Sequence, residues 1–215
     1  MQTLSLERLS AAFFLAAIAG CVDAVGFSEL GGYFVSFMSG NSTRFGLHIA
    51  AGDWSLALFT LGLIALFVGG VAAGTLIAGQ ARGWAPAAIL LTEAALLAVA
   101  ARLLVGPHPL RGVVLLPVAM GLSNAFLLRD GVRIGLTYMT GTLVRIGIGL
   151  AALGSGEGRA RALLLDMMLW LALVTGVVIG GIGYAHYRGG VLLGPAVALA
   201  VIGVVETLVN RRRTA

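Results

Sequence analysis

Long apolar runs dominate the pattern of hydrophobic and polar positions along this chain. A helix needs roughly 20 consecutive apolar residues to cross the hydrocarbon core of a bilayer, which is about 30 Å thick. A run at about 10–27 is apolar but carries Asp23 near its C-terminal end. Five plainer runs lie at about 57–79, 84–105, 110–128, 163–186 and 191–210. The pattern predicts an all-α integral membrane protein with about six transmembrane helices.

Two further stretches, 33–50 and 134–153, are apolar overall but interrupted by glycine, small hydroxyl residues and an arginine. If both cross the membrane completely, the chain has eight spans, whereas re-entrant or interfacial segments leave six. Arginine is enriched in cytoplasmic loops, and this bias favours six spans with both termini in the cytoplasm. The tail at 211–213, three consecutive arginines, is the strongest cytoplasmic anchor. We therefore expect a multi-pass protein of the cell inner membrane.

An internal sequence repeat relates the first half of the chain to the second half. Shifted by 101 positions, residues 20–52 overlay residues 121–153 with eight identities. These identities include the pairs Met38/Met139, Gly40/Gly141 and Arg44/Arg145. The repeat predicts one membrane domain, 1–215, built from two homologous halves at about 10–105 and 110–210. Three spans per half would make the halves inverted repeats and four would make them parallel, so the six-span arrangement predicts inverted repeats.

Composition narrows the function classes. Hydrophobic residues make up 59% of the chain and charged residues 11%, with a mean hydropathy of +1.01. A soluble domain carries about 25% charged residues, so soluble enzymes and nucleic-acid-binding domains are excluded, and the lipid bilayer is the expected partner. The net charge of +5 comes from arginine alone, since the sequence has no lysine. One cysteine, Cys21, allows no internal disulfide and no cysteine-based metal site.

Three motifs carry a resemblance to a known family. They are Ala19-Gly20-x-Val22-Asp23-Ala24, then Phe34-Val35-x-x-Met38-Ser39-Gly40-Asn41-Ser42, then Tyr138-Met139-Thr140-Gly141-Thr142. Together they resemble the YoaK family, a group of small bacterial integral membrane proteins defined by a domain of unknown function. The resemblance covers nearly the whole chain and implies a polytopic inner-membrane protein of about six spans. It brings no established substrate with it.

Arg44 and Arg145 are the first candidate site residues. An ionised arginine at membrane depth is costly, so it is normally paired, water-exposed or functional. Two arginines at equivalent repeat positions would form a cationic pair for a carboxylate, phosphate or other oxyanion, because each guanidinium offers a planar fork of donors. The alternative is that each arginine lies at headgroup level or neutralises an internal acid such as Asp23 or Glu93.

The remaining candidates are small or polar residues at membrane depth. Glycine followed by small polar residues is typical of a broken helix, whose freed backbone groups bind solutes in transporters. Asp23 faces Asn124 across the repeat, and the lone Glu93 is a proton-coupling candidate. The expected substrate-binding set is Asp23, Met38, Gly40, Asn41, Arg44, Asn124, Met139, Gly141, Thr142 and Arg145. The alternative for all of them is close helix packing and internal bonding.

The sequence favours a transporter or channel-like facilitator for a small polar or anionic solute, with its site between the two repeats. The alternative is a non-transport scaffold or accessory subunit of the membrane. No catalytic, metal-binding or cofactor motif occurs, so an enzyme is not expected and neither is a cofactor or metal. Glycine pairs at Gly70/Gly74 and Gly176/Gly180 are typical of helix-packing faces. They predict helix contacts within the chain or a homodimer through these glycine-rich faces.

Overall fold

The computed structural model describes residues 6–107, 109–127, 139–153 and 157–214. These ranges are helical throughout apart from short turns and contain no strand. The elements in chain order are α1 (Leu6–Glu29), α2 (Met38–Ala50), α3 (Trp54–Gln80), η1 (Arg82–Trp84), α4 (Ala85–Leu104), α5 (Pro109–Val113), α6 (Leu115–Leu127), α7 (Met139–Ala151), α8 (Glu157–Tyr187), η3 (Arg188–Leu192) and α9 (Leu193–Thr214). The all-α prediction is confirmed for these residues.

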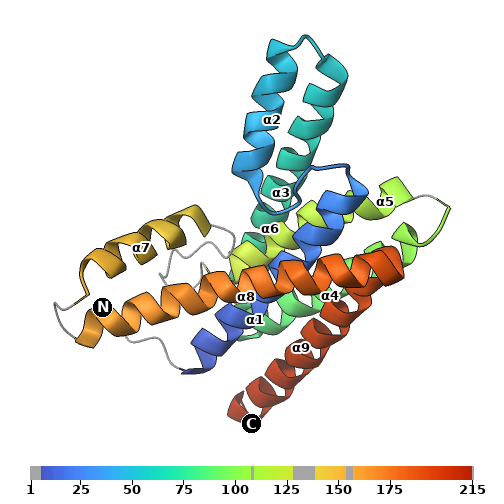
Figure 1. The fold of residues 1–215 in the computed structure, drawn as a ribbon. Coiled ribbons are helices and arrows are strands. Elements are labelled where there is room, and N and C mark those ends of the chain that lie inside the picture. The colour runs from blue at the N-terminus through green and yellow to red at the C-terminus, as the bar shows by residue number, and fades with distance from the viewer. Residues whose placement is uncertain (1–5, 108, 128–138, 154–156, 215) are drawn as a thin grey trace.

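Several of these helices are long and apolar enough to cross a bilayer. The described residues hold four such stretches, Ser10–Glu29, Trp54–Gln80, Ala85–Leu104 and Ala160–Arg212. The last stretch contains both α8 and α9, between which the chain reverses at η3 (Figure 1). Two shorter apolar helices cover Pro109–Ala125 and Met139–Ala151. The molecule therefore has the helices of a multi-span membrane protein, while the number of spans stays a prediction.

The apolar run expected as one helix at 110–128 is divided into α5 and α6. The break falls at Val114, three residues before Pro117. A proline has no backbone N–H, and its ring collides with the carbonyl four residues earlier, so it is tolerated only in the first turn of a helix. Pro117 therefore lies in the first turn of α6, and α5 ends at Val113.

The core is one cluster of buried side chains to which α1, α4, α6 and α9 contribute, with α6 and α9 packed on α4 and α1 packed on α8. Side chains with no solvent exposure come from each of these helices, among them Val22, Leu97, Leu116 and Leu199. The opposite faces of α3, α8 and α9 expose large aliphatic side chains, as at Leu58 and Ile179. A soluble protein would bury such faces, whereas a membrane protein presents them to lipid tails.

Two crossings bring helix backbones into direct contact through glycine. α1 packs on α8 and α3 packs on α6, the two most extensive helix contacts among the described residues. A methyl group at Gly176 would lie 2.8 Å from the Cα of Ala17, and one at Gly180 would lie 2.7 Å from the carbonyl oxygen of Cys21. On α3, a methyl group at Gly74 would lie 2.6 Å from the Cβ of Ala125.

Both glycine pairs are thus used inside the chain. Gly70 and Gly74 face α6, whereas Gly176 and Gly180 face α1, and all four are buried. The prediction of helix contacts is confirmed for these faces. A homodimer through the same faces finds no free surface there, because the chain itself already covers them.

The two interrupted stretches form the short helices α2 and α7, of 13 residues each. Each packs on the long helix that follows it, α2 on α3 and α7 on α8, and the two hairpins project from different sides of the molecule (Figure 1). The expected break at the first Ser-Gly pair lies earlier, since residues 30–37 are non-helical and α2 begins at Met38. The Met-Ser-Gly motif therefore starts a helix instead of interrupting one.

Candidate functional site

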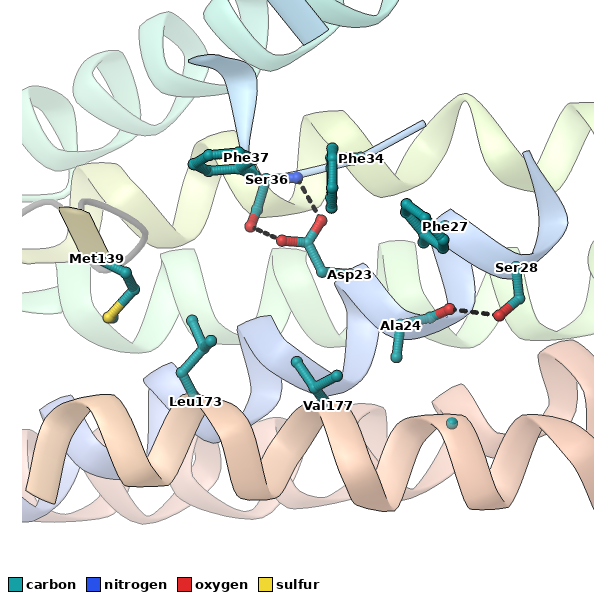
Figure 2. A pocket seen from close by; sticks show the side chains of 11 residues that line it. Asp23, Ala24, Phe27, Ser28, Phe34, Ser36, Phe37, Met139, Leu173 and Val177 are labelled. Atoms are coloured by element: carbon teal, nitrogen blue, oxygen red, sulfur yellow. Dashed lines mark hydrogen bonds between the residues drawn. The ribbon is translucent and has the colours of Figure 1, made fainter. Parts of the chain in front are cut away.

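A cavity of about 530 Å³ lies between α1, the loop at 30–37, the start of α7 and the middle of α8 (Figure 2). Its volume is within the range of small-molecule sites, about 300–1,000 Å³. Its lining residues are Asp23, Ala24, Phe27, Ser28, Phe34, Ser36, Phe37, Met139, Leu173, Val177 and Gly181. Most of these residues are apolar, and Asp23 is the charged residue among those that the structure describes.

Asp23 holds the loop at 30–37 against α1. Its Oδ1 accepts hydrogen bonds from the backbone N–H groups of Val35, at 2.9 Å, and Ser36, at 2.8 Å. The hydroxyl of Ser36 donates to Oδ2 (Figure 2). Val35 and Ser36 are buried, so these N–H groups would otherwise lack partners, and a buried unpaired donor is costly. The carboxyl group therefore fixes the wall of the cavity that the loop forms.

Glycine allows the loop to turn and to approach α1 closely. Gly31 and Gly32 have φ of +61° and +106°, which side chains rarely adopt. At Gly26, a methyl group would lie 2.6 Å from Cγ1 of Val35, so the loop could not lie this near the helix. The short segment between α1 and α2 thus folds back over the C-terminal part of α1 and places its aromatic side chains at the cavity.

Three phenylalanines form one continuous aromatic surface of the cavity. The ring centroids of Phe27 and Phe34 are 5.0 Å apart, and those of Phe34 and Phe37 are 5.1 Å apart at 84°. Gly40 lies beneath two of the rings, because a methyl group there would come within 2.6 Å of Phe37 and 3.0 Å of Phe34. Gly40 lies outside the cavity lining, and its small size positions the rings that form it.

Asn41 and Met38 act on the loop as well. The side-chain Oδ1 of Asn41 accepts from the N–H of Phe34 at 3.1 Å, and Nδ2 donates to the Phe34 carbonyl at 2.7 Å. The same Nδ2 lies 3.7 Å from the Met38 sulfur. Asn41 has no solvent exposure, so its amide is committed to the backbone of the loop. This bonding indicates that Asn41 holds the loop in place, and it argues against a direct contact of Asn41 with solute.

Arg44 lies on α2, beside the loop and away from the cavity. Its guanidinium lies over the ring of Tyr33, 4.9 Å from the centroid, and against Gly32. The Tyr33 hydroxyl is 2.8 Å from Nε2 of His48. Within the described part of the chain, no carboxylate comes within 4 Å of Arg44. An aromatic ring therefore takes the place of the internal acid that the sequence analysis considered as its partner.

Arg145, its counterpart in the predicted repeat, is held by an acid on α8. Its Nη2 lies 2.8 Å from Oδ1 of Asp166, Nε donates to the same oxygen at 2.9 Å, and Nη2 also donates to Thr142. Asp166 was not among the expected partners. Because Arg44 lies on α2 and Arg145 on α7, in hairpins on different sides of the molecule, the structure does not bring them together as a cationic pair (Figure 1).

The other expected residues are divided between the cavity and the helix interior. Met139 starts α7 and lines the cavity. Gly141 lies two residues later, in the first turn of the same helix. Asn124 is buried on α6, where Nδ2 donates to the Met120 carbonyl at 2.8 Å, and it is not part of the cavity lining. Tyr138, which belongs to the third sequence motif, lies outside the described residues.

Glu93 lies in the middle of α4 with no solvent exposure. The hydroxyl of Ser123 on α6 donates to its Oε1, while none of the described residues donates a hydrogen bond to its Oε2. A buried polar atom without a partner is rare and calls for an explanation. Glu93 is not part of the cavity lining.

Most residues of the cavity lining lie outside the set expected from the sequence. The aromatic rings of Phe27 and Phe37 were given no role, nor were Leu173, Val177 and Gly181 on α8. One signal was available, since phenylalanines at 27, 34 and 37 cluster in a chain where aromatic residues make up 7%. Among the described residues, no group of three or more histidine, cysteine, aspartate or glutamate side chains is placed to hold a metal ion.

The membrane-length helices and the lipid-type exposed faces define a polytopic helical membrane protein. Residues 11–205 match the family described as Protein of unknown function (DUF1275), and the chain belongs to that family. A relative in Rhizobium meliloti (strain 1021), the UPF0700 transmembrane protein RA0705, is 36% identical over 98% of this chain and 90% of its own length. The UPF0700 transmembrane protein YoaK of Bacillus subtilis (strain 168) is 31% identical over 67% of this chain and 68% of its own. No solved structure matches the chain.

The resemblance to the YoaK family is therefore confirmed. The names of both relatives also agree with a transmembrane protein. Neither name states a substrate, so the function has to be argued from the cavity and its residues.

Proposed function

We propose that this protein is a transporter or channel-like facilitator for a small polar solute. The observation that carries the proposal is the cavity of about 530 Å³ inside a helical membrane protein. Its walls come from α1 and the following loop on one side and from α7 and α8 on the other. These are the two halves of the predicted repeat, and transporters place their sites at such repeat interfaces.

Two homologous halves are part of this proposal, and equivalent contacts support them. Gly176 packs on Ala17 of α1, and Gly70 packs on Val118 of α6. Ala17 and Val118 are 101 positions apart, the offset of the sequence repeat, and the two glycines are 106 apart, the offset found for the later part of the halves. The contact between α1 and α8 thus has its counterpart in the contact between α6 and α3.

Six spans in inverted halves fit the lengths and directions of the helices. At about 1.5 Å per residue, the 13 residues of α2 or α7 reach roughly 20 Å, less than the roughly 30 Å of hydrocarbon. α6 is equally short, but α5 and α6 follow each other over residues 109–127 and together reach roughly 28 Å. In Figure 1, α6 runs opposite to α1 and α8, as an axis in the membrane plane requires. We place both termini in the cytoplasm of an inner-membrane protein, with the arginine tail at 211–213 as the anchor.

An anionic solute has no support at this cavity. That expectation rested on Arg44 and Arg145 meeting at one site, and the two lie in separate hairpins. The described residues of the lining include the carboxyl group of Asp23 instead and no arginine. Glu93 remains the proton-coupling candidate, because its unpartnered Oε2 inside α4 is a place where a proton can bind.

Transport can be tested by closing the cavity. Gly181 lines it, and a methyl group built there meets nothing within 4 Å, so the backbone accepts a side chain at this position and Gly181→Phe is the variant designed to fill the cavity. Gly69 on α3 is equally open but lies outside the lining, so Gly69→Phe is the matched control. Uptake of radiolabelled choline, phosphate, glycine and glycerol is then measured in liposomes holding each protein, with and without a pH gradient.

We expect at least one solute to enter faster than into protein-free liposomes, with the Gly69→Phe rate unchanged and the Gly181→Phe rate at least tenfold lower. If Gly181→Phe transports as well as the parent protein, the cavity is not the pathway. If a folded parent protein moves none of the four solutes, the scaffold or accessory role gains. The internal bonding of Asn41 and of Arg145 already favours that second candidate. A pH gradient that accelerates the parent protein but not Glu93→Gln would support proton coupling.

A further inference from the structure

The cavity combines one carboxyl group with three aromatic rings. Figure 2 shows Asp23 at the centre of the lining, with Phe34 and Phe37 on the loop side and Phe27 on α1. The three rings touch in sequence, with centroids 5.0 and 5.1 Å apart. Among the described residues of the lining there is no arginine, lysine or histidine, so none of these residues offsets a negative charge on Asp23.

The hydrogen bonds to Asp23 leave room for one more partner. Two backbone N–H groups donate to Oδ1, and the Ser36 hydroxyl donates to Oδ2. A carboxylate has about four acceptor positions, so one position on Oδ2 remains. The three donors are neutral, so none of them offsets a negative charge on this group.

The aromatic rings also favour a cation in the cavity. The face of a phenylalanine ring carries partial negative charge and attracts a cation within about 6 Å of its centroid. The same rings exclude water and favour an apolar body next to the charge. An anion would meet the carboxylate with like charge, and a neutral apolar molecule would bury that carboxylate without compensation. A metal ion needs several oxygen ligands, and the described residues hold no such group.

We propose that the cavity binds a small organic cation, an amine or quaternary ammonium ion with an apolar body. Its ammonium group lies between Asp23 and the rings of Phe27, Phe34 and Phe37, and its apolar body lies against Leu173 and Val177 of α8. This inference rests on the proposed function, since it takes the cavity as the solute site, and it names the class of solute.

Four probes that share one aromatic ring and differ in charge test the inference. Benzylamine and benzyltrimethylammonium are cations, the second without an N–H group. Benzyl alcohol is neutral, and benzoate is an anion. Binding to the full-length protein in detergent is measured by isothermal titration calorimetry. We expect the two cations to bind at least tenfold more tightly than benzyl alcohol, with benzoate weakest and Gly181→Phe binding none of the four.

The variants separate the charge from the rings. Asp23→Asn should remove the tenfold preference for the cations while benzyl alcohol still binds. Phe27→Leu keeps an apolar wall at a side chain that is 41% exposed, so it should fold, and it should weaken benzyltrimethylammonium severalfold more than the alcohol. This second variant keeps the proposal testable if Asp23→Asn releases the loop and fails to fold.

A further set of titrations identifies the molecule that carries the ammonium group. This group belongs either to a free amine or to the headgroup of a phosphatidylethanolamine lipid. Titrations are repeated in nanodiscs of phosphatidylglycerol alone and of phosphatidylglycerol with phosphatidylethanolamine. Benzylamine that binds equally in both supports a free amine, whereas competition by phosphatidylethanolamine assigns the site to the lipid.

Equal binding of benzylamine and benzyl alcohol would overturn the inference, as would tighter binding of benzoate or no binding by any probe. An unchanged cation preference in Asp23→Asn would also overturn it. The uptake assay reports separately on the proposed function. Cation binding without uptake would remove transport and keep the cation site, whereas uptake without charge preference would keep transport and remove the cation site.

Discussion

The contact of Gly176 with α1 should make this glycine far less replaceable than Gly181, five residues further along the same helix. A methyl group at Gly176 would lie 2.7 Å from the carbonyl carbon and 2.8 Å from the Cα of Ala17. These are backbone atoms, so the contact can relax only if α1 and α8 move apart. At Gly181 a methyl group meets nothing within 4 Å. The two glycines therefore offer a matched pair for Gly→Ala substitution.

The magnitude follows from two effects. Alanine stabilises a helix interior by about 0.8–1.0 kcal/mol relative to glycine, and both substitutions gain this equally. Gly176→Ala also forces extra volume into a packed contact, which typically costs about 1–3 kcal/mol. The two variants should thus differ by about 1–3 kcal/mol. For a domain of this size that corresponds to about 2–12 °C in the melting temperature, at roughly 2–4 °C per kcal/mol.

The chain contains its own probe for this measurement. Cys21 is the single cysteine, it is 5% exposed, and it lies on α1 at this same crossing, against Gly180. A dye that fluoresces on reaction with a thiol therefore reports the separation of α1 from α8 during heating in detergent. Equal melting temperatures for Gly176→Ala and Gly181→Ala would refute the close backbone contact.

The same comparison on α3 examines the repeat. Gly70 meets the backbone of Val118 as Gly176 meets that of Ala17, whereas its neighbour Gly69 is open. Gly70→Ala should therefore lower the melting temperature relative to Gly69→Ala, with the same sign and a similar size. If only α8 responds, the two crossings are not equivalent and the argument for homologous halves weakens.

Three further substitutions have defined outcomes. Gly40→Ala should displace the ring of Phe37, 2.6 Å from the added methyl group, and weaken benzyltrimethylammonium binding severalfold in calorimetry; unchanged affinity would contradict the role of this glycine. Arg145→Gln should lower the free energy of unfolding by no more than about 1 kcal/mol, because its side chain is 44% exposed beside Asp166; a larger loss in the thiol-dye melt would indicate a role beyond this pair. Glu93→Gln keeps the acceptor for its one hydrogen bond and should melt within a few degrees of the parent protein, whereas a large loss would show that the carboxyl group itself is needed for folding.

Much of the helix layout could be predicted, because hydropathy directly reflects the transfer of each segment into lipid. The run expected at 57–79 corresponds to α3, Trp54–Gln80, and the run at 84–105 to α4, Ala85–Leu104. The break before α6 was missed although Pro117 was visible, because the run was judged by its apolar length alone. The sequence motifs also pointed to Asp23 and Met139, which do line the cavity.

The partners of the polar side chains could not be predicted. Asp166 lies 21 residues after Arg145 and on another helix, so their pairing depends on how α7 folds against α8. Asp23 binds Val35 and Ser36, 12 and 13 residues away, only because the glycines between them reverse the chain. The aromatic surface was hidden for a different reason, since a phenylalanine in an apolar stretch is equally compatible with lipid contact.

The packing of α1 on α8 has a consequence for how the protein is made. α1 packs mainly on α8, and its contact residue Ala17 precedes Gly176 by 159 residues. At about 5–20 residues per second, a ribosome needs roughly 8–30 s to synthesise the partner of a helix that has already left the exit tunnel. During that interval the glycine crossing surface of α1 stands open in the translocon or the lipid, and a nascent chain truncated before α8 never covers it. Membrane insertases and quality-control proteases should therefore recognise an incomplete chain chiefly by the uncovered surface of α1.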